Sequence, residues 1–349
     1  MKTKVCVVGH FGGNKECLDG QTIKTKMVTS ELKRRFGEDQ IAVFDTHGGW
    51  KTLFKSPIQT FRALKKSENV IIFPAHNGLR VYAPLLAFQK RFFKGRKIHY
   101  VVIGGWLPRF LEKRRYLAAR LKKFDGIYVE TSTMKKALEE KGFSNVYVMP
   151  NCKKLTVLSP DQLVYPTGAP YKLCTFSRVV KEKGIETAVN AVKLVNESLG
   201  YQAFSLDIYG PVDSTQTEWF DNLRKEFPSF VRYGGLVPYD KSVDVLKAYF
   251  ALLFPTYYDG EGFAGTLLDA FSAGVTVIAS DWKYNSELVD ASVGYLYPTE
   301  DTAALVDILK LAAADPATIL DKKKNCLKKA QEYTPHTAIQ VLVDKVERE

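Results

Sequence analysis

The chain has 349 residues, of which 46% are hydrophobic and 25% charged, and this length and balance predict a globular protein with two domains. No uninterrupted apolar stretch approaches the roughly 18 residues that a membrane-spanning helix needs, and the apolar run near the N-terminus is too short for a signal peptide. Five scattered cysteines without a C-x-x-C pair argue against a disulfide framework or a zinc site, and they favour a reducing, cytoplasmic compartment.

The net charge of +12 is distributed unevenly along the chain. Residues 1–155 carry 31 Lys and Arg against 12 Asp and Glu, a net charge of +19, whereas the remaining residues carry 19 against 26, a net charge of −7. A front half with this charge attracts phosphates, nucleic acid or an anionic membrane, and its motifs must decide among them.

The front half alternates β-branched runs with segments of helical spacing such as TKMVTSELKRRF. This alternation is typical of β-α-β units on a parallel sheet. Strands are predicted at 5–9, 41–45, 70–73, 98–105, 126–130 and 146–151.

After residues 150–170, which lack periodicity and are interpreted as a linker, the same alternation begins again. Two α/β domains joined in this way predict a cleft between them. The spacing of the apolar residues in HTAIQVLVDKVERE predicts a C-terminal helix that packs on a domain surface. The predicted division is 1–155, 156–335 and 336–349.

The stretch GEGFAGTLLDAFSAG follows a strand that is predicted to end near Pro255, and a helix is predicted to begin near Gly265. In an open parallel sheet, ligands bind at the carboxyl ends of strands, where a loop leads into the next helix. The N-terminus of such a helix presents backbone N–H groups and partial positive charge to a phosphate. Asp269, about one turn into the helix, can then reach a polyol such as ribose, and Glu261 in the loop lies nearer to the group that the phosphate carries.

Glu261 and Asp269 resemble the E-x7-E element of retaining glycosyltransferases of the GT-B fold, family 4, with Asp in place of the usual second Glu. FSRVVKEKGIETAV at 176–189 resembles the S-R-x4-K-G segment of that family, LDIYGP at 206–211 its strand and glycine turn, and VMPNC at 148–152 its interdomain strand. ASDWKYNSELV is similar to transferases that build capsular, exopolysaccharide or O-antigen chains. The resemblance spans nearly the whole chain and implies two Rossmann-like domains that face each other across a cleft.

The resemblance also implies roles for particular residues. Arg178 and Lys183 hold the nucleotide diphosphate, and with Glu261 they are the predicted catalytic residues. In the absence of the resemblance, the two cations are more typical of a surface charge cluster, and Asp269 of a solvated helix position. The predicted donor-binding residues are Gly20, Gly210, Gly262, Phe263, Ala264, Gly265, Thr266, Leu267 and Asp269.

The glycine-rich loop 9–26 fits neither a dinucleotide fingerprint nor a P-loop, so a Rossmann cofactor and an ATPase are poorly supported. In the resembled family a glycine at this turn faces the diphosphate and the acceptor, which implies that position for Gly20; a flexible surface turn is the alternative. None of the histidines has metal-ligand spacing, and the resemblance implies no metal and no other cofactor. The candidates for contact with the acceptor or the transferred sugar are Gly12, Gly13, His76 and Trp106.

The segment 107–124 places its apolar residues on one face of a predicted helix and carries seven basic residues against one acidic residue. Residues 88–97 add five cations among phenylalanines. A basic amphipathic helix is typical of a segment that lies on an anionic membrane surface, whereas an ordinary surface helix would bury the same apolar face in a core. The predicted membrane-binding residues are Arg114, Arg115, Lys122 and Lys123.

The resulting hypothesis is a retaining, metal-independent glycosyltransferase of surface polysaccharide biosynthesis. It transfers a sugar from a nucleoside diphosphate sugar to a hydroxyl of a lipid-linked glycan at the cytoplasmic face of the cell membrane. The favoured donor is a UDP-sugar. A GT-B epimerase or hydrolase of nucleotide sugars is the nearer alternative. A nucleic-acid-binding protein is the distant one, because no RNP, KH, zinc-finger or helix-turn-helix signature accompanies the basic charge.

Overall fold

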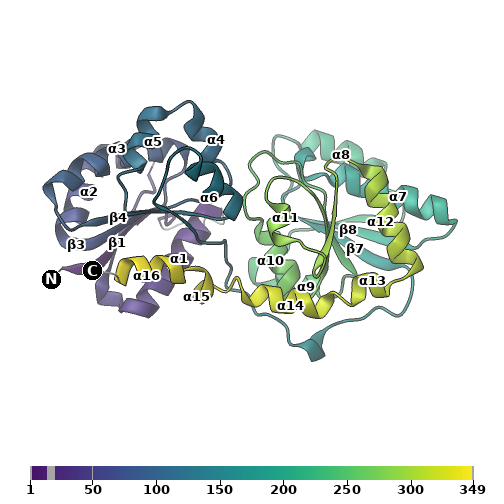
Figure 1. Cartoon of the computed structure of the whole chain (residues 1–349). Coiled ribbons are helices and arrows are strands. Elements are labelled where there is room, and N and C mark those ends of the chain that lie inside the picture. Colours follow the sequence, from purple (N-terminus) through teal and green to yellow (C-terminus); the bar gives the residue numbers. More distant parts are fainter. Residues whose placement is uncertain (1, 14–19, 49, 348–349) are drawn as a thin grey trace. The chain divides into compact units, whose positions relative to one another are not determined.

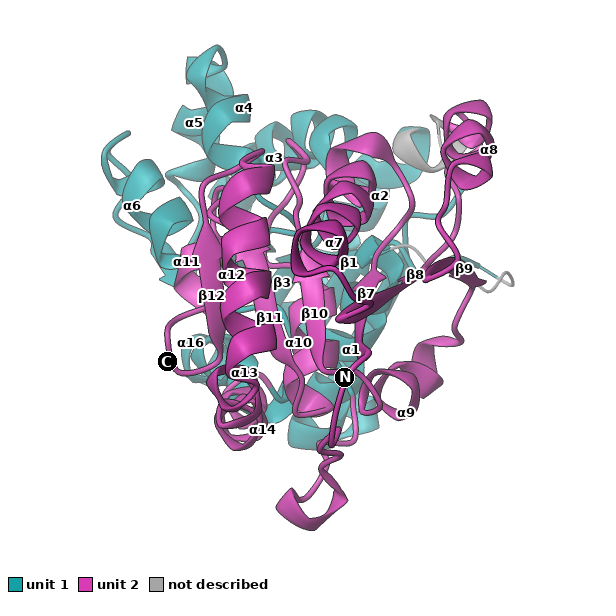
Figure 2. Cartoon of the chain, turned by 90° about the vertical axis from the view of Figure 1, so that its right-hand side faces the viewer, with its two compact units in different colours: residues 1–154, 334–349 teal, residues 155–333 magenta. Residues whose placement is uncertain are grey.

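The computed structural model describes residues 2–13, 20–48 and 50–347. The chain forms two compact units, which Figure 2 shows in different colours. Unit 1 contains residues 1–154 and 334–349, and unit 2 contains residues 155–333. Each unit holds one six-stranded sheet.

Unit 1 is built on a sheet with the order β2-β1-β3-β4-β5-β6, in which neighbouring strands are parallel. Helices α2 to α5 cover one face of this sheet, and α1 and α16 cover the other (Figure 1). The strands are β1 (Thr3–Gly9), β2 (Ile41–Asp45), β3 (Ser67–Ile72), β4 (Lys97–Val101), β5 (Gly126–Val129) and β6 (Val146–Val148). The helices are α1 (Gly20–Phe36), η1 (Glu38–Gln40), α2 (Trp50–Lys66), α3 (His76–Gln89), η2 (Lys90–Phe92), α4 (Leu107–Glu112), α5 (Arg115–Leu121), α6 (Ser132–Glu139), α15 (Pro335–Ala338) and α16 (Gln340–Glu347).

Unit 2 repeats this architecture with the order β12-β11-β10-β7-β8-β9, again parallel. The strands are β7 (Tyr171–Phe176), β8 (Phe204–Tyr209), β9 (Val231–Gly235), β10 (Ala251–Phe254), β11 (Thr276–Ser280) and β12 (Gly294–Tyr297). The helices are η3 (Pro160–Gln162), η4 (Lys181–Lys183), α7 (Ile185–Leu199), α8 (Thr217–Lys225), η5 (Tyr239–Lys241), α9 (Ser242–Leu246), α10 (Gly265–Ser272), α11 (Asn285–Leu288), α12 (Thr302–Ala314), α13 (Ala317–Leu320) and α14 (Lys323–Gln331).

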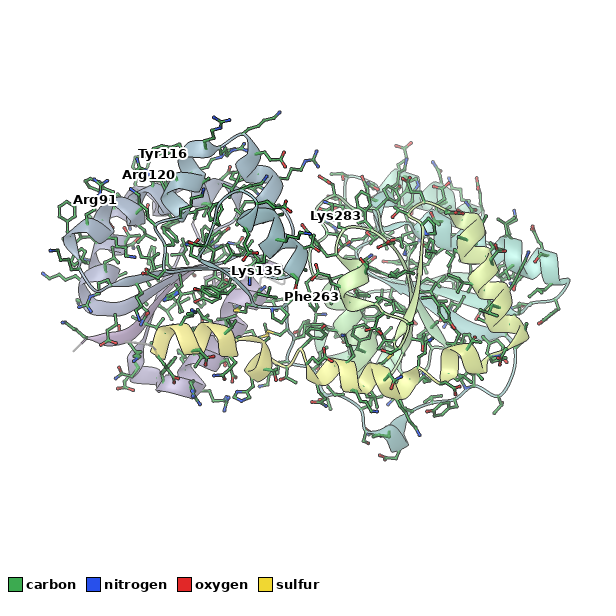
Figure 3. The ribbon with its side chains drawn as sticks, in the orientation of Figure 1. Arg91, Tyr116, Arg120, Lys135, Phe263 and Lys283 are labelled. Carbon is green, nitrogen blue, oxygen red and sulfur yellow. The ribbon has the colours of Figure 1, made fainter. Side chains whose placement is uncertain are left out.

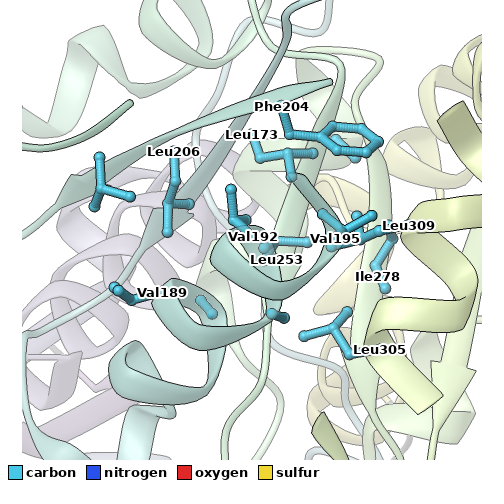
Figure 4. Close-up of a cluster of buried hydrophobic side chains, with 14 of the residues drawn as sticks. Leu173, Val189, Val192, Val195, Phe204, Leu206, Leu253, Ile278, Leu305 and Leu309 are labelled. Atoms are coloured by element: carbon cyan, nitrogen blue, oxygen red, sulfur yellow. The ribbon is translucent and has the colours of Figure 1, made fainter. Parts of the chain in front are cut away.

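The core of unit 2 lies on both faces of its sheet. On one face, Val189, Val192 and Val195 of α7 and Leu305 and Leu309 of α12 pack against apolar strand side chains (Figure 4). A second cluster, which includes α10, covers the other face. Strands that are buried on both faces must be apolar throughout, and this explains the continuous hydrophobic runs of the sequence.

Two segments differ from, or extend, the organisation expected from the sequence. Residues interpreted as a linker at 150–170 belong largely to unit 2, because Leu158 and Leu163 are buried in its core and the Leu158 N–H donates to the Ser272 carbonyl at 3.0 Å. The C-terminal segment returns to unit 1, where Ile339, Leu342 and Val346 are buried in its core.

The predicted single helix over 107–124 is wrong, since α4 and α5 are separate helices. The helical conformation is interrupted at Lys113 and Arg114, and Arg114 Nη1 donates to the Phe110 carbonyl at 2.8 Å. The apolar residues Leu107, Leu111 and Leu117 are buried, so this face is core. Among the helices that the structure describes, none combines the length and apolar character that a membrane crossing needs.

Each sheet has one point at which successive connections turn to opposite sides. In unit 1 this point lies between β1 and β3, and in unit 2 between β7 and β10. The carboxyl ends of the strands at such a point leave a crevice between diverging loops, which is where open parallel sheets bind ligands. The candidate ligand-binding loops are therefore those that follow β1 and β3 in unit 1 and those that follow β7 and β10 in unit 2.

Candidate active site

In unit 2 the loops after β7 and β10 bring together the three predicted catalytic residues. Arg178 and Lys183 follow β7, and Glu261 follows β10. The Arg178 guanidinium lies 5.5 Å from the centre of the Tyr258 ring, and the Lys183 ammonium lies 5.0 Å from the same centre. The cations thus share one aromatic neighbour, which holds both at the crevice.

Lys183 and Glu261 form a largely buried ion pair. Lys183 Nζ lies 2.5 Å from Glu261 Oε2, and their side chains are 11% and 9% exposed. The Thr256 hydroxyl donates to the same carboxylate oxygen at 2.9 Å. Lys183 therefore already has an anionic partner, and in this arrangement it positions Glu261 as well as offering charge to a ligand.

Arg178 is the more available of the two cations. Its side chain is 46% exposed, and among the described residues it pairs with the carboxylate of Asp213, with Nη1 and Oδ2 3.4 Å apart. A long, exposed contact of this kind is weak, because solvent screens it. The guanidinium can exchange it for a phosphate, which it can bind through two parallel hydrogen bonds.

Two glycines set the shape of this crevice. Gly184 has φ +70°, and a Cβ there would lie 2.1 Å from the Pro255 carbonyl oxygen. Gly210, after β8, has φ +132°, and a Cβ there would lie 1.9 Å from the Ser177 carbonyl oxygen. Any larger residue would force the loops apart, so both positions require glycine.

Helix α10 begins at this crevice, as the sequence predicts. Ala264 is its N-cap residue and provides no side-chain cap, so the first turn of α10 can direct backbone N–H groups to an anion. The Thr266 hydroxyl donates to the Phe176 carbonyl, which ties the start of α10 to the end of β7. Thr266 is therefore placed to contribute its backbone N–H rather than its hydroxyl.

The remaining predicted donor-binding residues of unit 2 are largely buried. Gly262 is buried, Phe263 packs edge-on against Tyr333 with ring centres 4.9 Å apart, and Leu267 belongs to the core. Figure 3 labels Phe263 together with Lys283, whose ammonium lies 2.9 Å from an Asp259 carboxylate oxygen.

Asp269 is not a solvated helix residue. Its side chain is buried, and Oδ1 accepts a hydrogen bond from the Ser242 hydroxyl of α9 at 2.7 Å. A buried carboxylate that is held by a neighbouring helix has a fixed direction, which favours a specific polar contact over a general surface charge.

Several residues of this site carry no signal in the sequence. Thr256 and Ser242 support the two carboxylates, and Tyr258 lies beside both cations. The Tyr258 carbonyl also accepts from Trp282 Nε1 at 2.8 Å. Threonine, serine and tyrosine are common everywhere, so only the folded loops reveal these partners.

Unit 2 has another hollow, of about 690 Å³, between η4 and α8. Glu186, Glu218 and Glu226 lie on its walls together with Lys181 and Trp219. Three carboxylates repel a diphosphate, so this hollow is a poorer candidate for a nucleotide than the loops after β7 and β10.

In unit 1, a cavity of about 440 Å³ lies at the carboxyl ends of β1 and β3. Its walls include Gln21, Thr46, His76 and Asn77, which offer amide, hydroxyl and imidazole groups. The Tyr82 side chain also lines the cavity, and burial raises the pKa of its hydroxyl to about 12, so the group stays protonated. A polar cavity of this size suits a sugar ring.

The unit 1 candidates divide into two groups. His76 and Trp106 stack with ring centres 3.9 Å apart, and Phe110 lies 5.0 Å from the His76 ring. Desolvation, followed by the charges of Arg114 and Arg80, lowers the pKa of His76, so its imidazole is neutral at pH 7. Gly12 and Gly13 belong to the loop after β1, where Gly12 is buried and Gly13 donates its N–H to Asp45 at 3.0 Å, whereas Gly20 is the exposed first residue of α1.

The four predicted membrane-binding residues are not equivalent. Arg114 stacks over the Phe110 ring at 3.9 Å, and Lys122 Nζ donates to the Lys141 carbonyl at 2.7 Å. Arg115 and Lys123 are exposed. Only the last two keep their charges fully directed to solvent.

Within the residues that the structure covers, no group of three or more His, Cys, Asp or Glu side chains could hold a metal ion.

The fold and the sequence of unit 2 both match known proteins. A crystal structure of Anabaena Alr3699/HepE in complex with UDP and glucose superposes with a TM-score of 0.70 over 99% of this chain and 100% of that chain, at 15% identity. The protein therefore has the GT-B fold of two Rossmann-like domains. Residues 166–333, which lie in unit 2, match the family model described as glycosyl transferases group 1.

Curated relatives match about half of this chain. The GtfA subunit of a UDP-N-acetylglucosamine–peptide N-acetylglucosaminyltransferase from Streptococcus gordonii is 30% identical over 186 residues, which cover 50% of this chain and 34% of the relative. The amylovoran biosynthesis glycosyltransferase AmsK from Erwinia amylovora is 25% identical over 186 residues, which cover 51% of this chain and 45% of the relative. This chain thus spans less than half the length of either relative.

Proposed function

We propose that the protein is a retaining, metal-independent glycosyltransferase that moves a sugar from a UDP-sugar to a hydroxyl of a lipid-linked glycan in surface polysaccharide biosynthesis. The observation that carries the proposal is the pairing of an exposed cation, Arg178, with the uncapped start of α10 at the same crevice of unit 2. Two independent anion-binding features at one crevice fit a diphosphate.

The chemistry follows from these positions. The bond between the sugar C1 and the diphosphate oxygen breaks, and its electron pair stays on the diphosphate. Arg178, Lys183 and the N–H groups of α10 would stabilise that charge as it develops, which is electrostatic catalysis without a metal. The acceptor oxygen forms the new bond to C1, and its proton passes to the departing phosphate.

Glu261 is assigned to orient the sugar rather than to attack it. Its carboxylate is held by Lys183 and Thr256, so its position is fixed and its charge is largely neutralised. A glycosidase-type nucleophile needs a second carboxylate facing it across the sugar, and Asp269 is committed to Ser242. We therefore assign attack on the same face that the diphosphate leaves, which retains the anomeric configuration.

The donor and acceptor rest on the relatives. The HepE structure contains UDP and glucose, the GtfA relatives are named for UDP-N-acetylglucosamine, and AmsK is named for polysaccharide synthesis. The cavity of unit 1, with His76 at its wall, is assigned to the acceptor or the transferred sugar. A lipid-linked acceptor would place the reaction at the cytoplasmic face of the cell membrane.

Release of UDP from UDP-glucose and UDP-N-acetylglucosamine tests the proposal, measured with a chelator present and with or without a lipid-linked glycan extract. The expected result is release that requires the acceptor and an α-linked product by NMR. Equal consumption of donor with and without acceptor would instead indicate an epimerase or hydrolase. Loss of UDP release in the Arg178→Ala variant under the same conditions would link the activity to this crevice.

A further inference from the structure

Helix α2 buries Leu64 together with two small hydroxyl side chains, but it exposes three large apolar side chains. Ser56 and Thr60 are fully buried against unit 1, whereas Phe54 is 77% and Ile58 60% exposed. Phe61 is exposed as well, and positions 54, 58 and 61 follow the spacing of one helix face. Three large apolar side chains on one exposed helix face form a patch that is unfavourable in water, so this face is adapted to a surrounding other than water.

The exposed apolar surface continues over the neighbouring helices, since α3 packs between α2 and α5. Phe88 lies in the last turn of α3 and Phe92 in η2, with ring centres 5.5 Å apart. Tyr116 on α5 is 62% exposed. We define the aromatic face of unit 1 as Phe54, Ile58, Phe61, Phe88, Phe92 and Tyr116.

Cations surround the aromatic face. Residues 50–97 contain eleven Lys and Arg and a single carboxylate, Glu68. Arg91 lies over the Phe88 ring at 6.0 Å and Arg120 over the Tyr116 ring at 4.5 Å, and Figure 3 labels Arg91, Tyr116 and Arg120 on the outer side of unit 1. In the described part of the chain, no ion pair is formed by Arg91, Lys94 or Arg115.

We propose that the aromatic face of unit 1 docks on the surface of an anionic lipid bilayer. Aromatic and aliphatic side chains enter the boundary between headgroups and acyl chains, and the surrounding Lys and Arg bind the lipid phosphates. This face differs from the predicted patch of Arg114, Arg115, Lys122 and Lys123, which stays a prediction and in which Arg114 and Lys122 donate to carbonyl groups of their own unit.

Other occupants fit the face less well. A second copy of the chain would bring two positively charged faces together, which repel each other. A nucleic acid would use the cations, but it has no use for exposed Ile58, whose aliphatic side chain can neither stack on a base nor donate a hydrogen bond. The proposal is independent of the sugar chemistry, because none of these residues belongs to the crevice of unit 2.

Vesicle flotation tests the proposal with the full chain. We expect binding to vesicles of phosphatidylglycerol and phosphatidylcholine, little binding to pure phosphatidylcholine, and weaker binding at about 1 M than at about 0.1 M salt. Arg91→Gln with Lys94→Gln lowers the partition coefficient by about 30-fold, and Ile58→Ser with Phe92→Ser lowers it by at least about tenfold.

The matched control carries the same type of substitution on unit 2. Leu194→Ser with Leu311→Ser removes two exposed leucines and is expected to bind as the unchanged chain does. Each variant must unfold at the same melting temperature as the unchanged chain. We expect this because the substituted side chains are exposed. If the chain binds vesicles but transfers no sugar, the proposed function is contradicted and the proposed docking face is not.

The proposal is overturned by equal binding to both vesicle types or by face variants that bind unchanged. It is also overturned if light scattering without lipid shows a dimer that the Ile58→Ser, Phe92→Ser variant loses, since the face would then be a contact between copies. Binding of duplex DNA that exceeds vesicle binding and is lost in the same variant would assign the face to nucleic acid instead.

Discussion

Both units bury a lysine–glutamate pair at the carboxyl edge of the sheet, but the two pairs differ in their access to solvent. In unit 1, Lys24 Nζ lies 2.5 Å from Glu130, and the side chains are only 3% and 2% exposed. In unit 2, the Lys183–Glu261 pair has the same distance and is 11% and 9% exposed. The sealed pair can serve only the fold, whereas the more open pair can exchange a partner with a ligand.

The units also differ in charge. Unit 1 has 33 Lys and Arg against 15 Asp and Glu, a net charge of +18, and unit 2 has 17 against 23, a net charge of −6. In unit 1 residues 50–97 alone contribute eleven cations against one carboxylate, while unit 2 concentrates two cations at one crevice. The charge of unit 1 therefore suits attraction to an anionic surface, whereas the two cations of unit 2 suit binding of an anion at one site.

The largest expected effect concerns the backbone of unit 2. Gly210→Ala should lower the free energy of unfolding of unit 2 by about 5 kcal/mol, because the new Cβ meets the Ser177 carbonyl in a left-handed conformation. The control is Gly95→Ala in unit 1, where φ is +80° and the Cβ would meet nothing within 4 Å, so the loss should be about 1 kcal/mol. Urea unfolding measures both, and equal losses would show that the close approach is unimportant.

The two buried pairs should respond differently to the loss of lysine. Lys24→Met leaves Glu130 buried without its main cationic partner and should cost about 4 kcal/mol of stability in unit 1, with UDP affinity unchanged. Lys183→Met should cost about 3 kcal/mol in unit 2 and also weaken UDP binding.

A second variant separates fold from function at the more open pair. Lys183→Met with Glu261→Gln removes both charges and should recover most of the stability but not the UDP affinity. Chemical unfolding and calorimetric titration measure the two quantities. Recovery of UDP affinity in the double variant would mean that Lys183 acts only through Glu261.

Arg178 should affect catalysis without affecting the fold. Arg178→Ala is expected to lower turnover by about 10²-fold, on the scale of one lost oxyanion donor, while the free energy of unfolding changes by less than about 0.5 kcal/mol. Steady-state kinetics and urea unfolding on the same preparation check this. Turnover within about twofold of the unchanged enzyme would remove Arg178 from the site.

A smaller effect distinguishes the units by pH. His99 in unit 1 is buried between Asn69 and Tyr128, each 3.0 Å from a ring nitrogen, and burial lowers the pKa of His99 from 6.5 to about 4. Because the folded pKa is depressed, its contribution to stability is full above pH 6.5 and is lost as pH falls toward 4. Unit 1 should lose about 2 kcal/mol between pH 7 and pH 5 from this residue.

The control for this pH effect is His99→Gln, which keeps a polar side chain but cannot titrate. The variant should show a correspondingly flatter dependence of unfolding free energy on pH between 7 and 5. An unchanged slope would assign the acid sensitivity of unit 1 to other groups.

Much of unit 2 is predictable from the sequence, because its site is fixed by local backbone requirements. The end of β10 and the start of α10 follow from apolar runs and glycines that have few structural alternatives, whereas the assignment of Arg178 and Glu261 follows from the resemblance to a known family. Asp269 was assigned to the helix, but its partner Ser242 lies on another helix, and no sequence pattern links the two.

Unit 1 is less predictable, because tertiary contacts decide its functional surfaces. The break between α4 and α5 accompanies the contact of Arg114 with Phe110, and helical spacing alone continues through it. The exposed side of α2 follows from which of its faces the sheet accepts, and periodicity identifies faces without saying which one is buried. The stack of His76 on Trp106 joins residues 30 positions apart and is invisible to any local pattern.

The central claim is that the crevice of unit 2 binds a nucleoside diphosphate without a metal, and thermal unfolding with UDP, GDP, ADP or CDP in the presence of a chelator tests it most directly. Ligand that binds only the folded state raises the melting temperature by mass action. We predict a rise with UDP that Arg178→Ala greatly reduces. A melting temperature that none of the four nucleotides changes would contradict the assignment of this crevice.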